Sequence, residues 1–148
     1  MENLGRKALA VVTAMITSLA IIGVGWMVAT KAPFSTPSQM EYVTRGDLLA
    51  YANAAPPLYW AIGLVSYALA GFAGGFIVSK MARRWTTGGY GLSLFVGGLL
   101  TIFGLASYMY WTGPLWFLAG TLLIFIPAAA IAHRFAEGAS NPHVPEHA

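Results

Sequence analysis

Long apolar stretches alternate with short polar segments along the whole chain. The apolar stretches cover residues 8–30, 58–79, 89–111 and 115–132, and no Asp, Glu, Lys or Arg lies inside them. Because a helix of about 20 apolar residues crosses a bilayer core of roughly 30 Å, each stretch predicts one transmembrane helix. The pattern therefore predicts an all-α polytopic membrane protein, folded as an antiparallel bundle of four transmembrane helices.

The connecting segments carry different turn signals. Residues 31–57 form an outer loop in which Thr44 and Asp47 stand at the spacing of a capping box, so a short helix is expected there. That helix lies either on the membrane surface or across the outer ends of the spans. Residues 86–89 and 112–114 are tight turns, which make the second, third and fourth spans antiparallel neighbours.

Basic residues collect at one end of the predicted spans. Lys31 and Arg45 lie in the outer loop, and the others flank the opposite ends: Arg6, Lys7, Lys80, Arg83, Arg84 and Arg134. The positive-inside rule then places both termini in the cytoplasm, with residues 134–148 as a cytoplasmic tail of a single integral membrane domain, residues 1–148. The net charge of +3 is explained by this topology, and no nucleic-acid partner is predicted. The lipid bilayer is the predicted partner.

Small residues recur at four-residue spacing in the second and third spans. Within lipid, helices associate through close backbone approach, which small side chains allow. The candidate helix-packing face consists of Gly63, Tyr67, Gly71, Gly75, Ser93, Gly97 and Thr101. This face fits packing inside the bundle, and it also fits a homo-oligomer or a contact with a larger membrane complex.

Aromatic side chains gather at the outer ends of the spans. The candidate rim consists of Trp26, Tyr59, Trp60, Tyr108, Trp111 and Trp116. An aromatic belt at the headgroup level explains these residues, and a site for a lipid, quinone or pigment is the alternative. Tyr67 is a phenol deeper in the second span, where its hydroxyl is expected to bond a hydroxyl or carbonyl of a neighbouring helix. Pro127 is expected to kink the fourth span.

The predicted spans contain no Asp, Glu, Lys, Arg, His, Asn or Gln. Proton-coupled pumps keep such groups near the midplane, so this class is excluded. The span hydroxyls are expected to bond their own helix backbone, and His133 is expected to cap the end of the last helix. With no cysteine, no nucleophile–base pair and no metal-ligand set, the sequence predicts neither an enzyme nor a cofactor.

Two segments carry a family resemblance: residues 74–84 (GGFIVSKMARR) and residues 114–129, which begin PLWF and end IPAA. They resemble the second-helix end and the last helix of uncharacterised small bacterial four-helix inner-membrane proteins. The resemblance implies a bacterial inner (plasma) membrane location and no activity. The leading hypothesis is a structural or accessory subunit that packs against itself or a larger complex. The alternative is a carrier or binder of a neutral or apolar ligand.

Overall fold

The computed structural model describes residues 2–31, 46, 50, 54–83, 89–111 and 113–138. Its helices are α1 (Glu2–Lys31), α3 (Pro57–Arg83), α4 (Gly89–Trp111) and α5 (Leu115–Gly138), and the described residues contain no strand. All four are long and apolar enough to cross a membrane. The prediction of an all-α chain with four apolar helices is therefore confirmed.

The helices differ from the predicted spans mainly at their ends. α5 continues to Gly138, whereas the sequence ended the last span at residue 132 and began a tail at residue 134. The predicted span ended at residue 132 because Arg134 is the first charged residue after it. A charged residue can nevertheless remain helical, with its side chain extended toward the membrane surface. The predicted outer helix at Thr44 and Asp47, and the tail from residue 139, lie outside the described residues.

Prolines mark the beginnings of α3 and α5. Pro57 is the first residue of α3, a position that needs no backbone N–H donor. The N–H of Tyr59 then donates to the carbonyl of Pro56 at 3.0 Å, and the N–H of Phe117 donates to the carbonyl of Pro114 at 3.0 Å. The Tyr108 hydroxyl donates to the carbonyl of Gly113 at 2.8 Å, which ties the end of α4 to the turn before α5.

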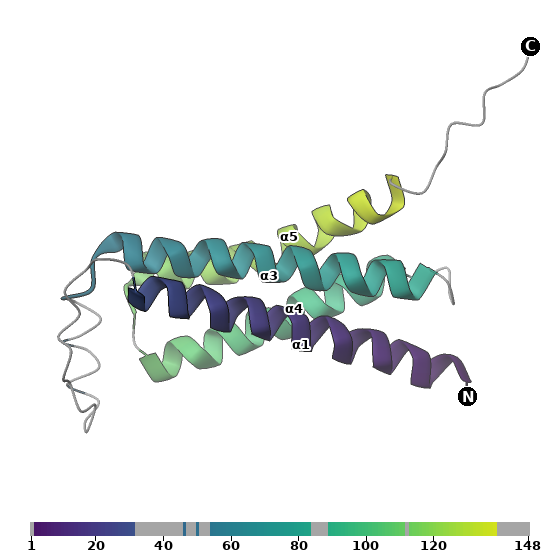
Figure 1. The fold of residues 1–148 in the computed structure, drawn as a ribbon, viewed down its shortest axis with the longest axis horizontal. Coiled ribbons are helices and arrows are strands. Elements are labelled where there is room, and N and C mark those ends of the chain that lie inside the picture. The colour runs from purple at the N-terminus through teal and green to yellow at the C-terminus, as the bar shows by residue number, and fades with distance from the viewer. Residues whose placement is uncertain are drawn as a thin grey trace, which may run out of the picture.

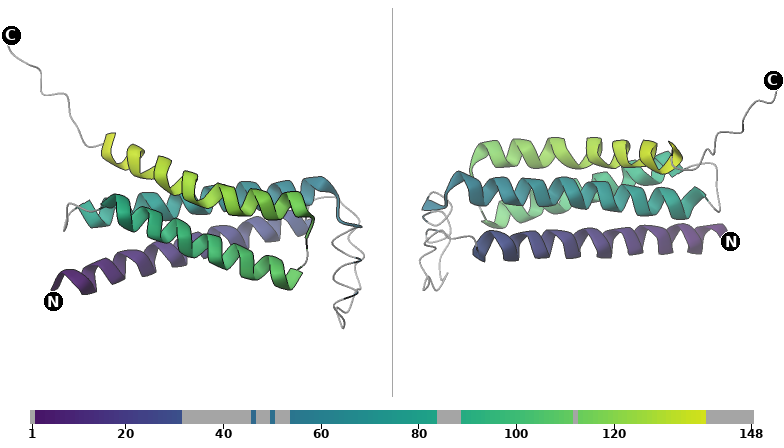
Figure 2. Two further views of the ribbon diagram at one scale, coloured as in Figure 1. Left: turned by 180° about the vertical axis from the view of Figure 1, so that it is seen from behind. Right: turned by 45° about the horizontal axis from the view of Figure 1, so that its top comes forward.

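Helix α3 lies at the centre of the structure, and α1, α4 and α5 all pack against it (Figure 1, Figure 2). Helix α4 also packs along α5, whereas α1 and α4 meet over only a short length. Ser18 of α1 meets Ala70 of α3, and Trp26 of α1 meets Tyr59, so these two helices run in opposite directions. The start of α1 and the ends of α3 and α5 lie at the same end of the molecule (Figure 1).

Two serine hydroxyls link helices through their backbones. Ser18 of α1 donates to the carbonyl of Ala70 in α3 at 2.8 Å, and Ser93 of α4 donates to that of Ala129 in α5 at 2.7 Å. The sequence led us to expect such hydroxyls to bond their own helix. That expectation holds for Thr17, Ser66, Thr101, Ser107 and Thr121. It is wrong for Ser18 and Ser93, which lie where a neighbouring helix comes close.

The close approach of α1 and α3 depends on Gly74, because a Cβ added there would lie 2.5 Å from the Ser18 hydroxyl.

Replacing Ser18 by Ala is expected to lower the free energy of unfolding by about 0.5–1 kcal/mol, the usual contribution of one hydrogen bond between membrane helices. Thr17→Ala is the matched control, because the Thr17 hydroxyl bonds its own helix at the carbonyl of Thr13. Equilibrium unfolding in lipid bicelles measures both. Equal effects of the two variants would contradict a link between α1 and α3.

Candidate functional site

A cavity of about 350 Å³ lies where α1 ends, α3 begins and α4 turns into α5. Its wall is mainly aromatic: Trp26, Tyr59, Trp60, Tyr67, Phe103, Tyr108 and Phe117. The remaining lining residues are Ile22, Thr30, Ser107 and Gly113. The volume falls within the range of pockets that hold small molecules, and such pockets are lined mostly by apolar and aromatic groups. All four helices and the α4–α5 turn contribute to it.

Trp26 of α1 contacts several other rings of the aromatic wall. Its ring centroid lies 5.2 Å from that of Tyr59, 6.1 Å from that of Trp60 and 6.1 Å from that of Phe117. Most of these pairs are tilted or edge-to-face, the geometries that aromatic quadrupoles favour. Gly63 leaves the necessary room, because an added Cβ there would lie 3.0 Å from Cη2 of Trp26. The wall is therefore a packed cluster of rings from α1, α3 and α5.

Most hydroxyls of the lining already donate to backbone carbonyls. Ser107 donates to Phe103 at 2.9 Å, Thr30 to Met27 at 2.9 Å and Tyr108 to Gly113 at 2.8 Å. The lining contains no Asp, Glu, Lys, Arg or His. The cavity is consequently neutral, and its other polar side-chain atoms belong to indole and phenol groups.

The polar atoms of Trp60 and Tyr67 differ in their partners. The indole N–H of Trp60 is buried and has no hydrogen-bond acceptor among the residues that the structure describes. The Tyr67 hydroxyl lies within hydrogen-bonding reach of the Trp26 indole on α1. The expected bond from Tyr67 to a hydroxyl or carbonyl of a neighbouring helix is not found among the described residues. An indole carries a donor and no acceptor, so Trp60 needs an acceptor that this part of the chain does not supply.

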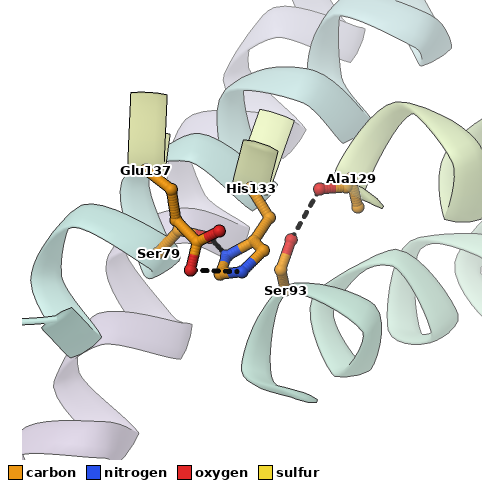
Figure 3. A network of polar contacts seen from close by, with 5 residues as sticks. All are labelled: Ser79, Ser93, Ala129, His133 and Glu137. Atoms are coloured by element: carbon orange, nitrogen blue, oxygen red, sulfur yellow. Dashed lines mark hydrogen bonds and ion pairs between the residues drawn. The ribbon is translucent and has the colours of Figure 1, made fainter. Parts of the chain in front are cut away.

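A second polar group surrounds His133 (Figure 3). His133 lies in the last turns of α5, whereas Phe117 of the cavity wall lies in its first turn. Nδ1 of His133 is 3.1 Å from the Ser79 hydroxyl, and Nε2 is 3.2 Å from a carboxylate oxygen of Glu137. The Tyr90 ring lies against the imidazole with centroids 5.2 Å apart. The expectation that His133 caps a helix end is wrong, because α5 continues to Gly138 and the ring is buried between α3, α4 and α5.

The contacts of His133 suit an interhelical link. In the neutral ring, Nε2–H can donate to Glu137 while Nδ1 accepts from the Ser79 hydroxyl, so all three groups are satisfied. The sequence revealed no nucleophile–base pair, whereas the structure places Ser79 against an imidazole. In serine hydrolases the nucleophile contacts Nε2 and the carboxylate contacts Nδ1, which is the reverse of this order. Ser79 is also only 3% exposed and does not line the cavity.

No protein-family model, curated protein or solved structure matches the chain.

The predicted aromatic rim divides in the structure. Trp26, Tyr59, Trp60 and Tyr108 line the cavity, together with Tyr67 from the predicted packing face. Trp116 is 47% exposed and does not line the cavity, and the side chain of Trp111 lies outside the described part of the chain. The sequence reading missed several lining residues: Ile22, Thr30, Phe103, Ser107, Gly113 and Phe117. Their one common signal is a position in the α4–α5 turn or within about three turns of the helix ends on that side of the molecule.

The glycines of the predicted packing face all approach α5. A Cβ added at Gly63 would meet the Phe117 ring at 3.3 Å, and one added at Gly71 would meet the Phe125 carbonyl at 3.2 Å. Gly75 approaches most closely, with Cα of Ala129 at 2.7 Å from such an atom. On α4, Ser93 and Gly97 reach the same part of α5, whereas the Thr101 hydroxyl bonds its own helix at Gly97. These small residues are occupied by contacts inside the structure.

Proposed function

We propose that the chain is a multi-pass protein of the bacterial inner membrane, folded as an antiparallel four-helix bundle with both termini in the cytoplasm. Four apolar helices support the membrane location. The orientation is supported by Arg6, Lys80 and Arg134, which belong to the start of α1 and the ends of α3 and α5, at one end of the molecule (Figure 1). In this orientation the cavity lies near the outer face of the membrane.

Within that membrane, the protein binds a neutral, largely apolar small molecule. The observation that carries this proposal is the cavity of about 350 Å³ with an aromatic wall and no charged lining residue. A ligand that is already dissolved in the bilayer enters such a cavity without leaving water, whereas an ion would lose its hydration with no countercharge to replace it. Binding or carriage of a neutral ligand is therefore the function that the geometry supports best.

The hypothesis of a structural or accessory subunit has less support from the geometry. It rested on the small-residue faces, on the missing charge within the spans and on the short connecting loops. Gly63, Gly71 and Gly75 face α5 within the same chain. The accessory role remains a prediction, and failure to find any bound small molecule would favour it.

The cavity proposal is tested by filling the cavity. Ser107 lines it from α4, and Ser107→Trp is expected to reduce the amount of co-purifying small molecule about tenfold, a change of ~1.4 kcal/mol in binding free energy. Mass spectrometry of protein extracted in mild detergent measures the bound molecule. Met109→Trp is the matched control on the same helix, since Met109 is 70% exposed and lies outside the lining. The proposal fails if the unmodified protein carries no small molecule, or if both variants retain it equally.

A further inference from the structure

The cavity reaches the side of the molecule between α1 and α4. On α1 its lining residues become more exposed toward the helix end, from Ile22, which is 5% exposed, through the half-buried Trp26 to the exposed Thr30. On α4, Phe103 lines the cavity and is 40% exposed. The residue before it, Ile102, is 66% exposed and belongs to the outer surface of the helix. Phe103 therefore joins the cavity wall to the surface that faces lipid in the proposed membrane orientation.

The packing of α4 shows that Phe103 lies on its α1 side. A Cβ added at Gly97 would meet α5 at 3.1 Å, which identifies the side of α4 that packs on α5. An α-helix turns by about 100° per residue, so Phe103 lies roughly 120° around α4 from Gly97. It shares a face with Val96, and a Cβ added at Gly74 of α3 would meet both Val96 and Ser18 of α1. Because α1 and α4 meet over only a short length, Phe103 lies at a side opening between these two helices.

A hydrocarbon chain suits this opening better than water does. The hydroxyls of Thr30, Ser107 and Tyr108 already donate to backbone carbonyls, and the lining contains no charged side chain. A buried water molecule needs several polar partners, whereas an unfilled apolar cavity forfeits dispersion contacts along its wall. Hydrocarbon from the bilayer supplies those contacts without leaving an apolar medium. A lipid chain beside the opening is therefore favoured to fill the cavity.

The cavity also has the direction and depth of a chain that descends from the membrane surface. Thr30 and Ile22 mark its two ends on α1, which lie about 12 Å apart along the helix axis. On α3, Tyr59 and Tyr67 mark the same two ends. Phe125 closes the deep end, because it is fully buried and its ring stacks on that of Tyr67. The cavity thus follows a chain through most of one leaflet of a bilayer core roughly 30 Å thick.

We propose that one acyl chain of a membrane lipid occupies the cavity, entering between α1 and α4 past Phe103, with the lipid headgroup left at the membrane surface. This inference rests on the proposed function and names its ligand class. Any other neutral ligand must displace the chain, so binding of such a ligand depends on the lipid composition of the membrane.

Photocrosslinking in lipid nanodiscs tests the occupant. The probe is a phosphatidylethanolamine with a diazirine in the middle of one acyl chain, and mass spectrometry of the digested protein locates the crosslinks. Crosslinks are expected at Ile22 and Tyr67, which line the cavity and are 5% and 2% exposed, so lipid outside the bundle reaches them poorly. Ile102, which is 66% exposed, is labelled by the surrounding lipid and serves as the internal reference.

Two variants locate the chain and its path. Ser107→Trp fills the cavity and Phe103→Trp enlarges the ring at the opening. Each is expected to reduce the crosslinks at the two deep residues about tenfold relative to those at the reference residue. Phe95→Trp is the matched control for Phe103→Trp, since Phe95 is 54% exposed on the same helix and lies outside the lining. It is expected to leave the ratio unchanged, and an equally unchanged ratio in Phe103→Trp would contradict entry past Phe103.

A free fatty acid with the same diazirine chain separates the two sources of an acyl chain. Labelling of Ile22 and Tyr67 by the phospholipid identifies a phospholipid as the source. Labelling by the fatty acid alone supports the acyl chain and identifies a free fatty acid instead.

Two outcomes would overturn the acyl-chain assignment while leaving the proposed function intact. One is a different co-purifying small molecule together with no labelling of Ile22 or Tyr67 by either probe. The other is equal labelling of these residues in the unmodified protein and in Ser107→Trp. If neither residue is labelled and no small molecule co-purifies, the proposed function fails as well.

Discussion

Gly75→Ala is expected to lower the free energy of unfolding by about 3 kcal/mol, at the upper end of overpacking effects. The added Cβ would lie 2.7 Å from Cα and 2.9 Å from the carbonyl oxygen of Ala129. These are backbone atoms, so no rotamer change relieves the overlap and α3 must move away from α5. The same atom would lie 2.9 Å from the Ser93 hydroxyl, which donates to the Ala129 carbonyl at 2.7 Å. One methyl group thus disturbs the packing of α3, α4 and α5.

Gly23→Ala on α1 is the matched control for Gly75→Ala. An added Cβ at Gly23 meets no other atom within 4 Å, so the alanine keeps only its advantage in helix propensity, up to about 1 kcal/mol. Equilibrium unfolding by steric trapping in bicelles compares the two variants under identical conditions. If Gly75→Ala is as stable as Gly23→Ala, the close approach of α3 and α5 is wrong.

The membrane helices could be predicted from the sequence because bilayer thickness fixes the length of an apolar stretch. The third stretch, residues 89–111, coincides with α4, and the second, residues 58–79, lies within α3. Helix ends were harder to predict, since a terminal charged turn can remain helical outside the apolar core. This is why α5 continues to Gly138 beyond the predicted end.

The cavity could be predicted only in part, because an aromatic belt and an aromatic cavity have the same sequence pattern. What separates them is the rotation of each helix about its axis. Trp116 and Phe117 are neighbours on α5, yet Trp116 is 47% exposed and Phe117 is 3% exposed. The sequence placed Trp116 in the predicted rim because it lies at the end of the span. The packing of α5 on α3 instead places Phe117 in the cavity wall.

The contact between Ser79 and His133 had no local signal in the sequence. The two residues belong to α3 and α5. They meet because these two helices run in the same direction, so that each step along α3 is matched by an equal step along α5. Gly63 with Phe117, Gly71 with Phe125 and Gly75 with Ala129 follow the same register. A register of this kind is a property of the packed helices, so the pairing is visible only in three dimensions.

Phe125→Ala is expected to lower the free energy of unfolding by about 2 kcal/mol. It is also expected to leave the ring of Tyr67, which lines the cavity, with less support. Phe125 is fully buried, and its ring stacks on that of Tyr67 with centroids 5.1 Å apart. Gly104 of α4 gives the ring room, because an added Cβ there would lie 3.1 Å from Cε2 of Phe125. The ring therefore fills the space between α3 and α4.

The expected effect is smaller than the ~3–5 kcal/mol typical of Phe→Ala in a water-soluble core, because lipid is as apolar as the protein interior. In the membrane, the free energy lost on Phe125→Ala comes only from the packing of the Phe125 ring against its neighbours. Phe95→Ala removes the same atoms from a side chain that is 54% exposed, and it is expected to change stability little. Unfolding in bicelles gives the difference between the two variants, which isolates the packing contribution. Equal losses would mean that Phe125 faces lipid, and the Tyr67 side of the cavity would then lack its support.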